Sequence, residues 1–263
     1  MPYDPNRFDQ RNERLIELGA QFVERCVVPY HRATIRGVER IPSGPALYVG
    51  NHSGALLSID TFIAFARVFA RRGLDDLPFG LAHSVAVRAP LLNQILVPLG
   101  AVEASHDNLE RAFDAGKKVL VYPGGDIDSM RPFRHRNRVK FGGRTGFMRA
   151  ALRHRVPIVP LVAAGAHGTL IIIDDLPWLA KLLGVDERFR IEVWPLALSI
   201  PWGVTLGPTP PYFPLPAKID LEFLEPITFE HTGPEAADDP AYVASCARRV
   251  RNKMQLAMDR LVG

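Results

Sequence analysis

Residues 34–162 alternate between short apolar runs and segments with the spacing of an amphipathic helix, and this alternation constrains the fold more than any other feature. Short runs rich in Val, Ile and Leu predict strands, and the segments between them predict helices. A helix that connects two successive strands makes them parallel and packs outside the sheet. We therefore predict an α/β fold with a single, mostly parallel central sheet flanked by helices. Strands are expected at 34–38, 46–49, 81–87, 100–103, 119–122 and 158–162, and helices at 60–71, 91–97, 108–114 and 145–153.

The two ends of the chain are expected to be less regular than this middle part. Residues 1–33 predict an N-terminal amphipathic helix with arginines on one side, and most such helices pack on a core while a minority lie on membranes. Residues 34–263 are expected to form one domain, with a late strand at 218–224 and a closing helix at 242–261. The apolar side of the first helix is expected to carry Leu15, Leu18, Phe22, Val23, Cys26 and Val27.

One long segment, residues 193–217, contains no charged side chain. Its seven prolines and two glycines exclude a membrane-spanning helix, because proline removes a backbone donor and breaks helices. A hydrophobic segment lying on a surface, or a buried loop, is the expected structure. The polar first residues also argue against a signal peptide.

A second segment, residues 131–155, holds nine Lys and Arg residues and no Asp or Glu, in a chain whose net charge is only +4. Such a concentration of positive charge suits phosphates on a nucleic acid, an anionic membrane or a phosphorylated cofactor, and a solvated loop is the plain alternative. Nucleic acid is the weakest of these partners, because the segment lacks interleaved aromatic residues for base stacking.

Three loops that follow predicted strands can hold the chemistry. The first is 50–60, where His52 has the side chain best suited to act as a general base near neutral pH. The second is 119–132, where Gly124 and Gly125 allow close approach of backbone N–H groups to a ligand and Arg131 can pair with an anion. The third is the glycine-rich loop at 141–147. Each of these is by itself also typical of ordinary structure.

Other chemistries lack their motifs. The chain has no GxSxG nucleophile elbow, no GxGxxG and no phosphate-binding P-loop. Its eight histidines show no metal-ligand spacing, and Cys26 and Cys246 are too far apart in sequence for a CxxC site, so we expect no metal. Cysteine usage of this kind fits a reducing cytosol.

Taken in order, four blocks resemble the glycerolipid acyltransferase superfamily, both its lysophosphatidic-acid-acyltransferase-like and its diacylglycerol-acyltransferase-like members. Asn51-His52 followed by Asp60 resembles the family's His-x4-Asp block. Residues 99–105 resemble its second block, 122–128 stand where many members carry Phe-Pro-Glu-Gly-Thr-Arg, and 156–160 are similar to its fourth block. The resemblance covers 36–166 and implies the fold of a glycerol-3-phosphate acyltransferase.

The resemblance implies transfer of a fatty acyl group from an acyl thioester to a hydroxyl of a glycerolipid or lysophospholipid. His52 would be the general base, and Asp60 would fix its tautomer and stabilise the imidazolium. The donor would be acyl-coenzyme A or an acyl-carrier protein, with no further cofactor. Residues expected to bind substrate are Ser53, Gly54, Gly124, Gly125, Asp128, Arg131 and Arg144, with the N–H groups near Gly124 and Gly125 as candidate oxyanion donors.

Two departures from the family pattern leave alternatives open. Seven residues separate His52 from Asp60 instead of four, so direct pairing requires that 54–58 loop out of any helix. The third block lacks the family's Glu and Arg, which weighs against a phosphate-bearing acceptor. The alternative to an enzyme of phospholipid biosynthesis is a catalytically silent lipid- or acyl-binding protein on the same scaffold. For either, we expect a cytoplasmic protein peripherally associated with the inner face of an anionic membrane.

Overall fold

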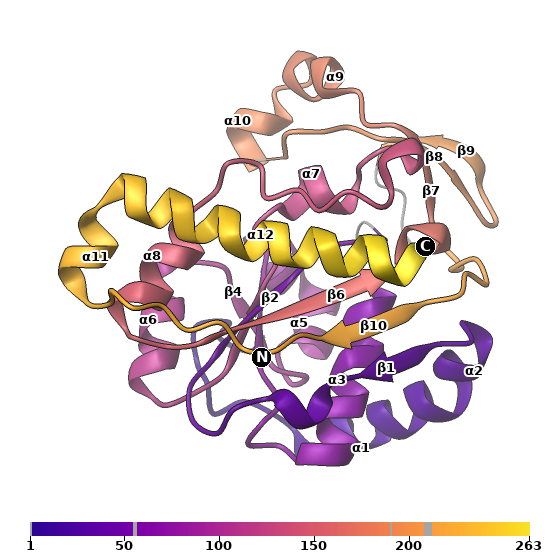
Figure 1. Ribbon diagram of the computed structural model, residues 1–263. Helices are drawn as coiled ribbons and strands as arrows, with labels where there is room; N and C mark the ends of the chain where they lie inside the picture. The colour runs from indigo at the N-terminus through magenta and orange to yellow at the C-terminus, as the bar shows by residue number, and fades with distance from the viewer. Residues whose placement is uncertain (1, 55–56, 190, 208–211) are drawn as a thin grey trace.

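The computed structural model describes residues 2–54, 57–189, 191–207 and 212–263, and its centre is a seven-stranded sheet (Figure 1). Five neighbouring strands run parallel, β10 runs antiparallel to them beside β6, and β1 pairs in parallel with β10 at the edge. The predicted class, a mostly parallel sheet flanked by helices, is confirmed. The strand order is β1 (Thr34–Arg36), β10 (Asp220–Phe223), β6 (Ile158–Ala164), β2 (Leu47–Gly50), β5 (Val119–Val121), β3 (Phe79–Ala82) and β4 (Ala101–Glu103).

Helices cover both faces of this sheet, which is why its central strands are continuously apolar. Leu47 and Val49 point to one face, into a core shared with α6 (His106–Asp114), α8 (Gly146–Arg153), α11 (Pro234–Asp238) and α12 (Pro240–Val262). Tyr48 points to the other, into a core shared with α1 (Glu13–Phe22) and α3 (Ile59–Arg72). In Figure 1, α12 crosses in front of the sheet. The period-two alternation of β2 therefore supplies both cores.

The N-terminal helix packs on this second core. Asn12 caps α1 by accepting from the Leu15 N–H at 3.0 Å, and the helix continues through a π-helical turn, η1 (Val23–Val27), into α2 (Val28–Tyr30). It is tied to α3 by an Arg67–Glu24 ion pair at 2.7 Å. The predicted apolar side is only partly correct: Val23 is buried, whereas Leu15, Leu18 and Phe22 are exposed, because Ile16 and Ala20 face the core instead. A boundary after residue 33 stays a prediction.

The strand predicted at 81–87 is wrong in its second half. β3 ends at Ala82, and α4 (Ser84–Arg88) follows at once, then α5 (Pro90–Leu96). The His83 side chain accepts from the Val85 N–H at 3.2 Å, which caps α4 and ends the extended conformation.

A second, three-stranded antiparallel sheet lies beyond the carboxyl ends of the parallel strands, with α9 (Pro177–Leu182) and α10 (Val185–Phe189) (top of Figure 1). Its strands are β7 (Ile171–Asp174), β8 (Leu196–Ser199) and β9 (Gly203–Leu206). The segment 193–217, expected to be a hydrophobic segment lying on a surface or a buried loop, supplies a β-hairpin, because Pro195 and Pro201 fall just outside its strands. Across the described residues, none of the helices combines the length and apolarity that crossing a membrane requires.

Candidate active site

The candidate site lies where β2, β5 and β6 end. These three strands are adjacent and parallel, so the loops that follow them meet at one edge of the sheet, the usual place for ligands in α/β proteins. The loop after β2 carries His52, and the loop after β5 carries Tyr122 and α7 (Gly125–Ser129). β6 leads into η4 (Ala166–Thr169) with His167.

Asn51 and Gly50 fix the point at which the chain leaves the sheet. The Asn51 side chain bonds both polar groups of the Ala163 backbone, donating to its carbonyl at 3.0 Å and accepting from its N–H at 2.8 Å, and so extends the pairing of β2 with β6. A Cβ atom on Gly50 would lie 2.4 Å from the Tyr122 ring. Glycine at this position therefore lets the Tyr122 ring reach His52.

His52 is held by its backbone and by its ring. Its N–H donates to Asp128 Oδ2 at 2.6 Å, and its carbonyl accepts from Arg131 at 3.2 Å and from His167 at 3.1 Å. The imidazole stacks on the Tyr122 ring with centroids 4.5 Å apart. Nδ1 lies 3.1 Å from Ser58 Oγ, while Nε2 makes no hydrogen bond to any residue that the structure describes. The ring is positioned through one nitrogen and leaves the other for a ligand.

Burial, and secondarily the positive charge of Arg131, lower the pKa of His52 to about 4. Burial also holds the pKa of the neighbouring His167 well below its ordinary value. Both imidazoles are therefore neutral at pH 7, and His52 has a lone pair with which to accept a proton.

Asp60 lies in the first turn of α3 and is joined to His52 through Ser58. Ser58 Oγ donates to Asp60 Oδ1 at 3.0 Å, and Ser53 Oγ donates to Oδ2 at 2.8 Å. Burial raises the pKa of Asp60 to about 6, against the hydrogen bonds from these two hydroxyls. The predicted looping of 54–58 agrees with the described part of that segment, since α3 begins only at Ile59; Ala55 and Leu56 lie outside the described residues. The sequence leaves open whether Asp60 contacts His52 directly, and in this structure the Ser58 hydroxyl lies between them.

Ser53 and Gly54, expected to bind substrate, instead shape this loop. Ser53 is buried and its hydroxyl is engaged by Asp60. Gly54 is also buried, with a φ of +71°, and its carbonyl accepts from the Leu57 N–H at 3.0 Å and from the Tyr212 hydroxyl. This burial weighs against contact with substrate, and the predicted substrate binding by Ser53 and Gly54 stays a prediction.

Asp128 and Arg131 form a fully buried ion pair at 2.5 Å behind His52. The Arg131 guanidinium also donates to four backbone carbonyls, those of His52, Asp128, His135 and Arg136. Burial raises the pKa of Asp128 to about 6, and the Arg131 charge opposes that rise. Both side chains are fully buried, which weighs against contact with substrate, and their predicted role in substrate binding stays a prediction.

Gly124, Gly125 and Arg144 line the other side of the site. Gly124 is buried, and a Cβ atom there would lie 2.1 Å from the Lys140 carbonyl oxygen. The Gly125 N–H donates to the Tyr122 carbonyl at 3.0 Å, so it is not free to hold an oxyanion. Arg144 keeps 38% of its side chain exposed while pairing with Asp126 and Glu192. Of the residues predicted to bind substrate, Arg144 is the one whose cation reaches solvent.

Sequence reasoning missed the residues that complete this arrangement: Ser58, Tyr122, His167 and Tyr212. Only Ser58 and Tyr122 gave a signal, because they lie within the blocks that resemble the acyltransferases. The Tyr212 hydroxyl, 155 residues away in the sequence, accepts from the Leu57 N–H at 3.2 Å, and nothing in the local sequence indicates that contact.

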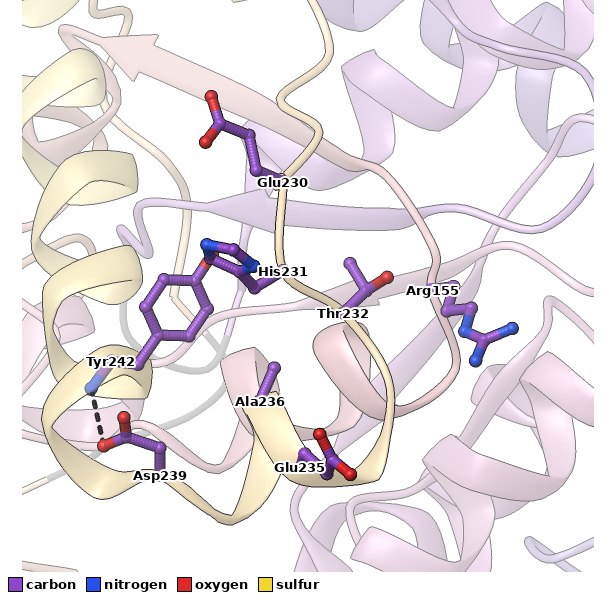
Figure 2. Close-up of a pocket in the computed structure, with 8 residues that line it drawn as sticks. All are labelled: Arg155, Glu230, His231, Thr232, Glu235, Ala236, Asp239 and Tyr242. Atoms are coloured by element: carbon purple, nitrogen blue, oxygen red, sulfur yellow. Dashed lines mark hydrogen bonds between the residues drawn. The ribbon is translucent and has the colours of Figure 1, made fainter.

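A shallow pocket of about 420 Å³ lies elsewhere, lined by His231, Tyr242 and Arg155 among others (Figure 2). Arg155 precedes β6, so this pocket lies at the amino-terminal edge of the parallel strands, opposite the edge that holds His52. It is not part of the candidate site.

Sequence comparison shows which known proteins this chain is similar to. The Acyltransferase family profile matches residues 32–164. An uncharacterized protein of Mycobacterium tuberculosis is 30% identical over 234 residues, which are 89% of this chain and 62% of that protein. A Gallus gallus protein described as a DGAT1/2-independent enzyme synthesizing storage lipids is 24% identical, over 70% of this chain and 54% of its own length. The chain thus spans less than two thirds of the length of these relatives.

Among solved structures, the fold is similar to that of the 1-acyl-sn-glycerophosphate (LPA) acyltransferase PlsC from Thermotoga maritima. The TM-score is 0.56 at 16% identity, and the match covers 94% of this chain and 79% of that one.

Proposed function

We propose, from the premise that this chain belongs to the Acyltransferase family, that it transfers an acyl group from a thioester to a hydroxyl of a glycerolipid acceptor, with His52 as the general base. The observation that carries the proposal is the neutral His52 ring at the strand-end edge. Its Nδ1 is held by Ser58, and its Nε2 makes no hydrogen bond within the described chain.

The reaction needs one proton carrier and no covalent acyl-enzyme. His52 Nε2 takes the proton of the acceptor hydroxyl as the hydroxyl oxygen forms a bond to the thioester carbonyl carbon. The resulting tetrahedral oxyanion collapses, the carbon–sulfur bond breaks, and the thiolate leaves with the proton from the imidazolium. The products are an ester and a free thiol, and His52 returns to its neutral form.

Asp60 acts on the His52 ring through the Ser58 hydroxyl, which lies between them. For Nε2 to accept a proton, Nδ1 must carry one, and the Ser58 oxygen at 3.1 Å is its acceptor. The Ser58 hydroxyl in turn donates to Asp60 at 3.0 Å, so the carboxylate stabilises the imidazolium through one hydroxyl. The Ser53 N–H, also 3.1 Å from Nδ1, favours the opposite tautomer of the resting ring. We infer that substrate binding shifts His52 between these two hydrogen-bond arrangements.

The donor is proposed to be acyl-coenzyme A or an acyl-carrier protein, with Arg144 as a phosphate contact and Gly124 as the remaining candidate oxyanion donor. The acceptor is proposed to be a glycerolipid without a phosphate beside its reacting hydroxyl. The cation nearest His52, Arg131, is fully used by Asp128 and four carbonyls, which supports a neutral acceptor. We place the reaction at the cytoplasmic face of a membrane, where the acyl donor and the lipid acceptor are both available.

A catalytically silent lipid-binding protein is the second candidate function. It is favoured by one observation, the separation of Asp60 from His52 by Ser58. Purified protein incubated with labelled acyl-coenzyme A and a panel of glycerol, monoacylglycerol, diacylglycerol and lysophospholipid acceptors decides between the two functions.

We expect label to move into a lipid with the unchanged protein and with His231→Ala, an exposed histidine at the opposite edge of the sheet. His52→Ala should lower the rate by about 10²–10⁴-fold. Acceptor binding without transfer by the unchanged protein would favour the silent candidate, and full activity of His52→Ala would remove His52 from the mechanism.

A further inference from the structure

The β7–β8–β9 sheet is apolar on both faces. Its inner face carries Ile172 and Ala197, which are buried against Met130, Leu170 and Tyr212 beside the candidate site. The strand register brings Ile171, Leu198 and Val204 side by side on the outer face, with Leu196 opposite Leu206 in the next row. Leu198, Val204 and Leu206 are 41%, 63% and 57% exposed.

An antiparallel sheet that covers a core on one face and meets water on the other alternates apolar and polar residues. The β8–β9 hairpin breaks that rule, since no charged residue occurs anywhere between 193 and 217, and the charged residue of the sheet is Asp174 at the end of β7, beside Leu196. The exposed apolar surface is extended by Ile200, Trp202 and Phe213 beside the hairpin, and by Trp178 and Leu182 on α9 at the same end of the molecule (Figure 1). A contiguous apolar patch of this kind is typical of an interaction surface.

The fold also brings the basic segment to the border of this patch. η3 (Phe133–His135) packs beside β7, and Arg134 donates to the carbonyl of Ile173 at 3.3 Å. Arg134 is 57% exposed, and its pairing with Asp174 is long, at 3.8 Å. The uncharged segment 193–217 and the start of the basic segment 131–155 are far apart in sequence, yet both pack beside β7. An apolar face bordered by cations is complementary to an anionic bilayer.

We propose that the outer face of the β7–β8–β9 sheet docks on an anionic lipid bilayer, with Trp202 at the interfacial depth and the cations around Arg134 on the headgroups. The inner face of the same sheet packs on Leu57 and Met130, next to the His52 loop. Docking therefore holds the His52 loop close to the membrane that supplies the lipid acceptor. The inference rests on the proposed function only for the reason the surface exists, because the docking itself needs no turnover.

The test is co-sedimentation of the full chain with phosphatidylcholine vesicles containing none or 40% phosphatidylglycerol, without any acyl donor. Trp202→Ser with Val204→Ser removes the centre of the patch, and Arg134→Gln with Arg136→Gln removes two cations. The matched control is Leu91→Ser with Ile95→Ser on α5, at positions 82% and 53% exposed. Urea unfolding of each variant shows whether the fold is intact.

We expect binding that depends on phosphatidylglycerol and weakens at high salt. The hairpin variant should bind at least tenfold more weakly, and the arginine variant about 25-fold, at roughly fivefold for each cation near the surface. The α5 control should bind as the unchanged protein does.

Three results would overturn the proposal: no binding to anionic vesicles, equal binding by the hairpin variant, or an equal loss in the α5 control. A dimer of the unchanged chain that the hairpin variant dissolves, without vesicle binding, would make a second copy the occupant. Acyl transfer to a short-chain, water-soluble acceptor tests the proposed function separately from docking. This activity should persist in the hairpin variant even if that variant does not bind vesicles.

Discussion

Asp60→Asn should make the protein more stable and less active at the same time. The carboxyl group is 2% exposed, and hydrogen bonds from two serine hydroxyls and from the backbone at Asp60 and Thr61 compensate its ionised form only in part for the loss of water. Burial raises its pKa from 3.8 to about 6. The folded state therefore disfavours the ionised carboxylate of Asp60, although that is the form that would stabilise an imidazolium.

The size and sign of the stability effect follow from this difference in pKa. Below pH 3.8, Asp60 is protonated in both states and costs nothing. As the pH rises from 3.8 to 6, the unfolded chain releases its proton first, and the cost of ionising Asp60 in the folded state grows to about 3 kcal/mol. At pH 5 the cost is about 1–2 kcal/mol by the same relation. Asparagine stays neutral, and the Ser58 hydroxyl can turn to accept from its amide.

Urea unfolding at pH 5 and pH 8 measures this effect. The stability of Asp60→Asn relative to the unchanged protein should increase by about 1–2 kcal/mol between the two pH values, and the variant should be the more stable protein at pH 8. Asp107→Asn is the control, because Asp107 is 79% exposed and should change stability by less than about 0.5 kcal/mol. A variant that is less stable at pH 8, or a difference that does not depend on pH, would refute the reasoning. Near-normal turnover in the variant would separately exclude Asp60 from catalysis.

The remaining predictions concern the groups around this carboxylate. Ser58→Ala should lower kcat by about 10–100-fold with little change in KM, and Ser58→Thr should retain most activity. The double variant Ser58→Ala/Asp60→Asn should be no slower than the worse single variant, because the two residues act as one unit. Additive losses of kcat would show that they act separately. The acid limb of kcat/KM should lie near pH 6 in the unchanged protein, where Asp60 ionises, and move toward pH 4 in Asp60→Asn, where only protonation of His52 remains; an unmoved limb would contradict the link through Ser58. Arg131→Met should destabilise the fold by about 3–5 kcal/mol in thermal or urea unfolding, because it leaves Asp128 buried and unpaired; a loss below 1 kcal/mol would show that Asp128 finds another partner.

The sequence predicts the part of this structure that depends on local pattern. Val119–Val121 and Ile158–Ala164 are apolar runs bounded by Gly or Pro, and both form central strands near their expected positions. Because they neighbour β2, the loops that follow all three strands meet at one edge, and the expectation that His52 lies there required no side-chain detail. Local pattern gives the wrong prediction at 84–87. Their apolar run is typical of a strand, but the His83 side chain caps a helix there.

The rest of the site depends on contacts between distant residues. The path of the loop after His52 is fixed by the Tyr212 hydroxyl, and that path decides that Ser58 and not Asp60 meets the ring. The inward orientation of the Arg131 side chain could not be predicted from the sequence either. An arginine after a glycine-rich loop is typical of an anion site, whereas here the guanidinium pairs with the buried Asp128 carboxylate. The hairpin in 193–217 was missed because its prolines suggested a loop, although they flank its strands.

The inward direction of Arg131 links the two departures from the family pattern. Its charge neutralises Asp128, and both residues hold the His52 backbone, Asp128 at the N–H and Arg131 at the carbonyl. Burial lowers the pKa of the His52 ring, and the same charge adds to that effect and so helps to keep the ring neutral. A fully buried guanidinium committed to these tasks is not accessible to a phosphate, and in the proposed mechanism recognition of an anionic group moves outward to Arg144 and the cations of 134–140. In the proposed mechanism, such a site separates two tasks that one exposed arginine would combine. The buried ion pair holds the His52 backbone, and Nε2 of the ring, which makes no hydrogen bond within the described chain, is left to take the proton of the acceptor hydroxyl.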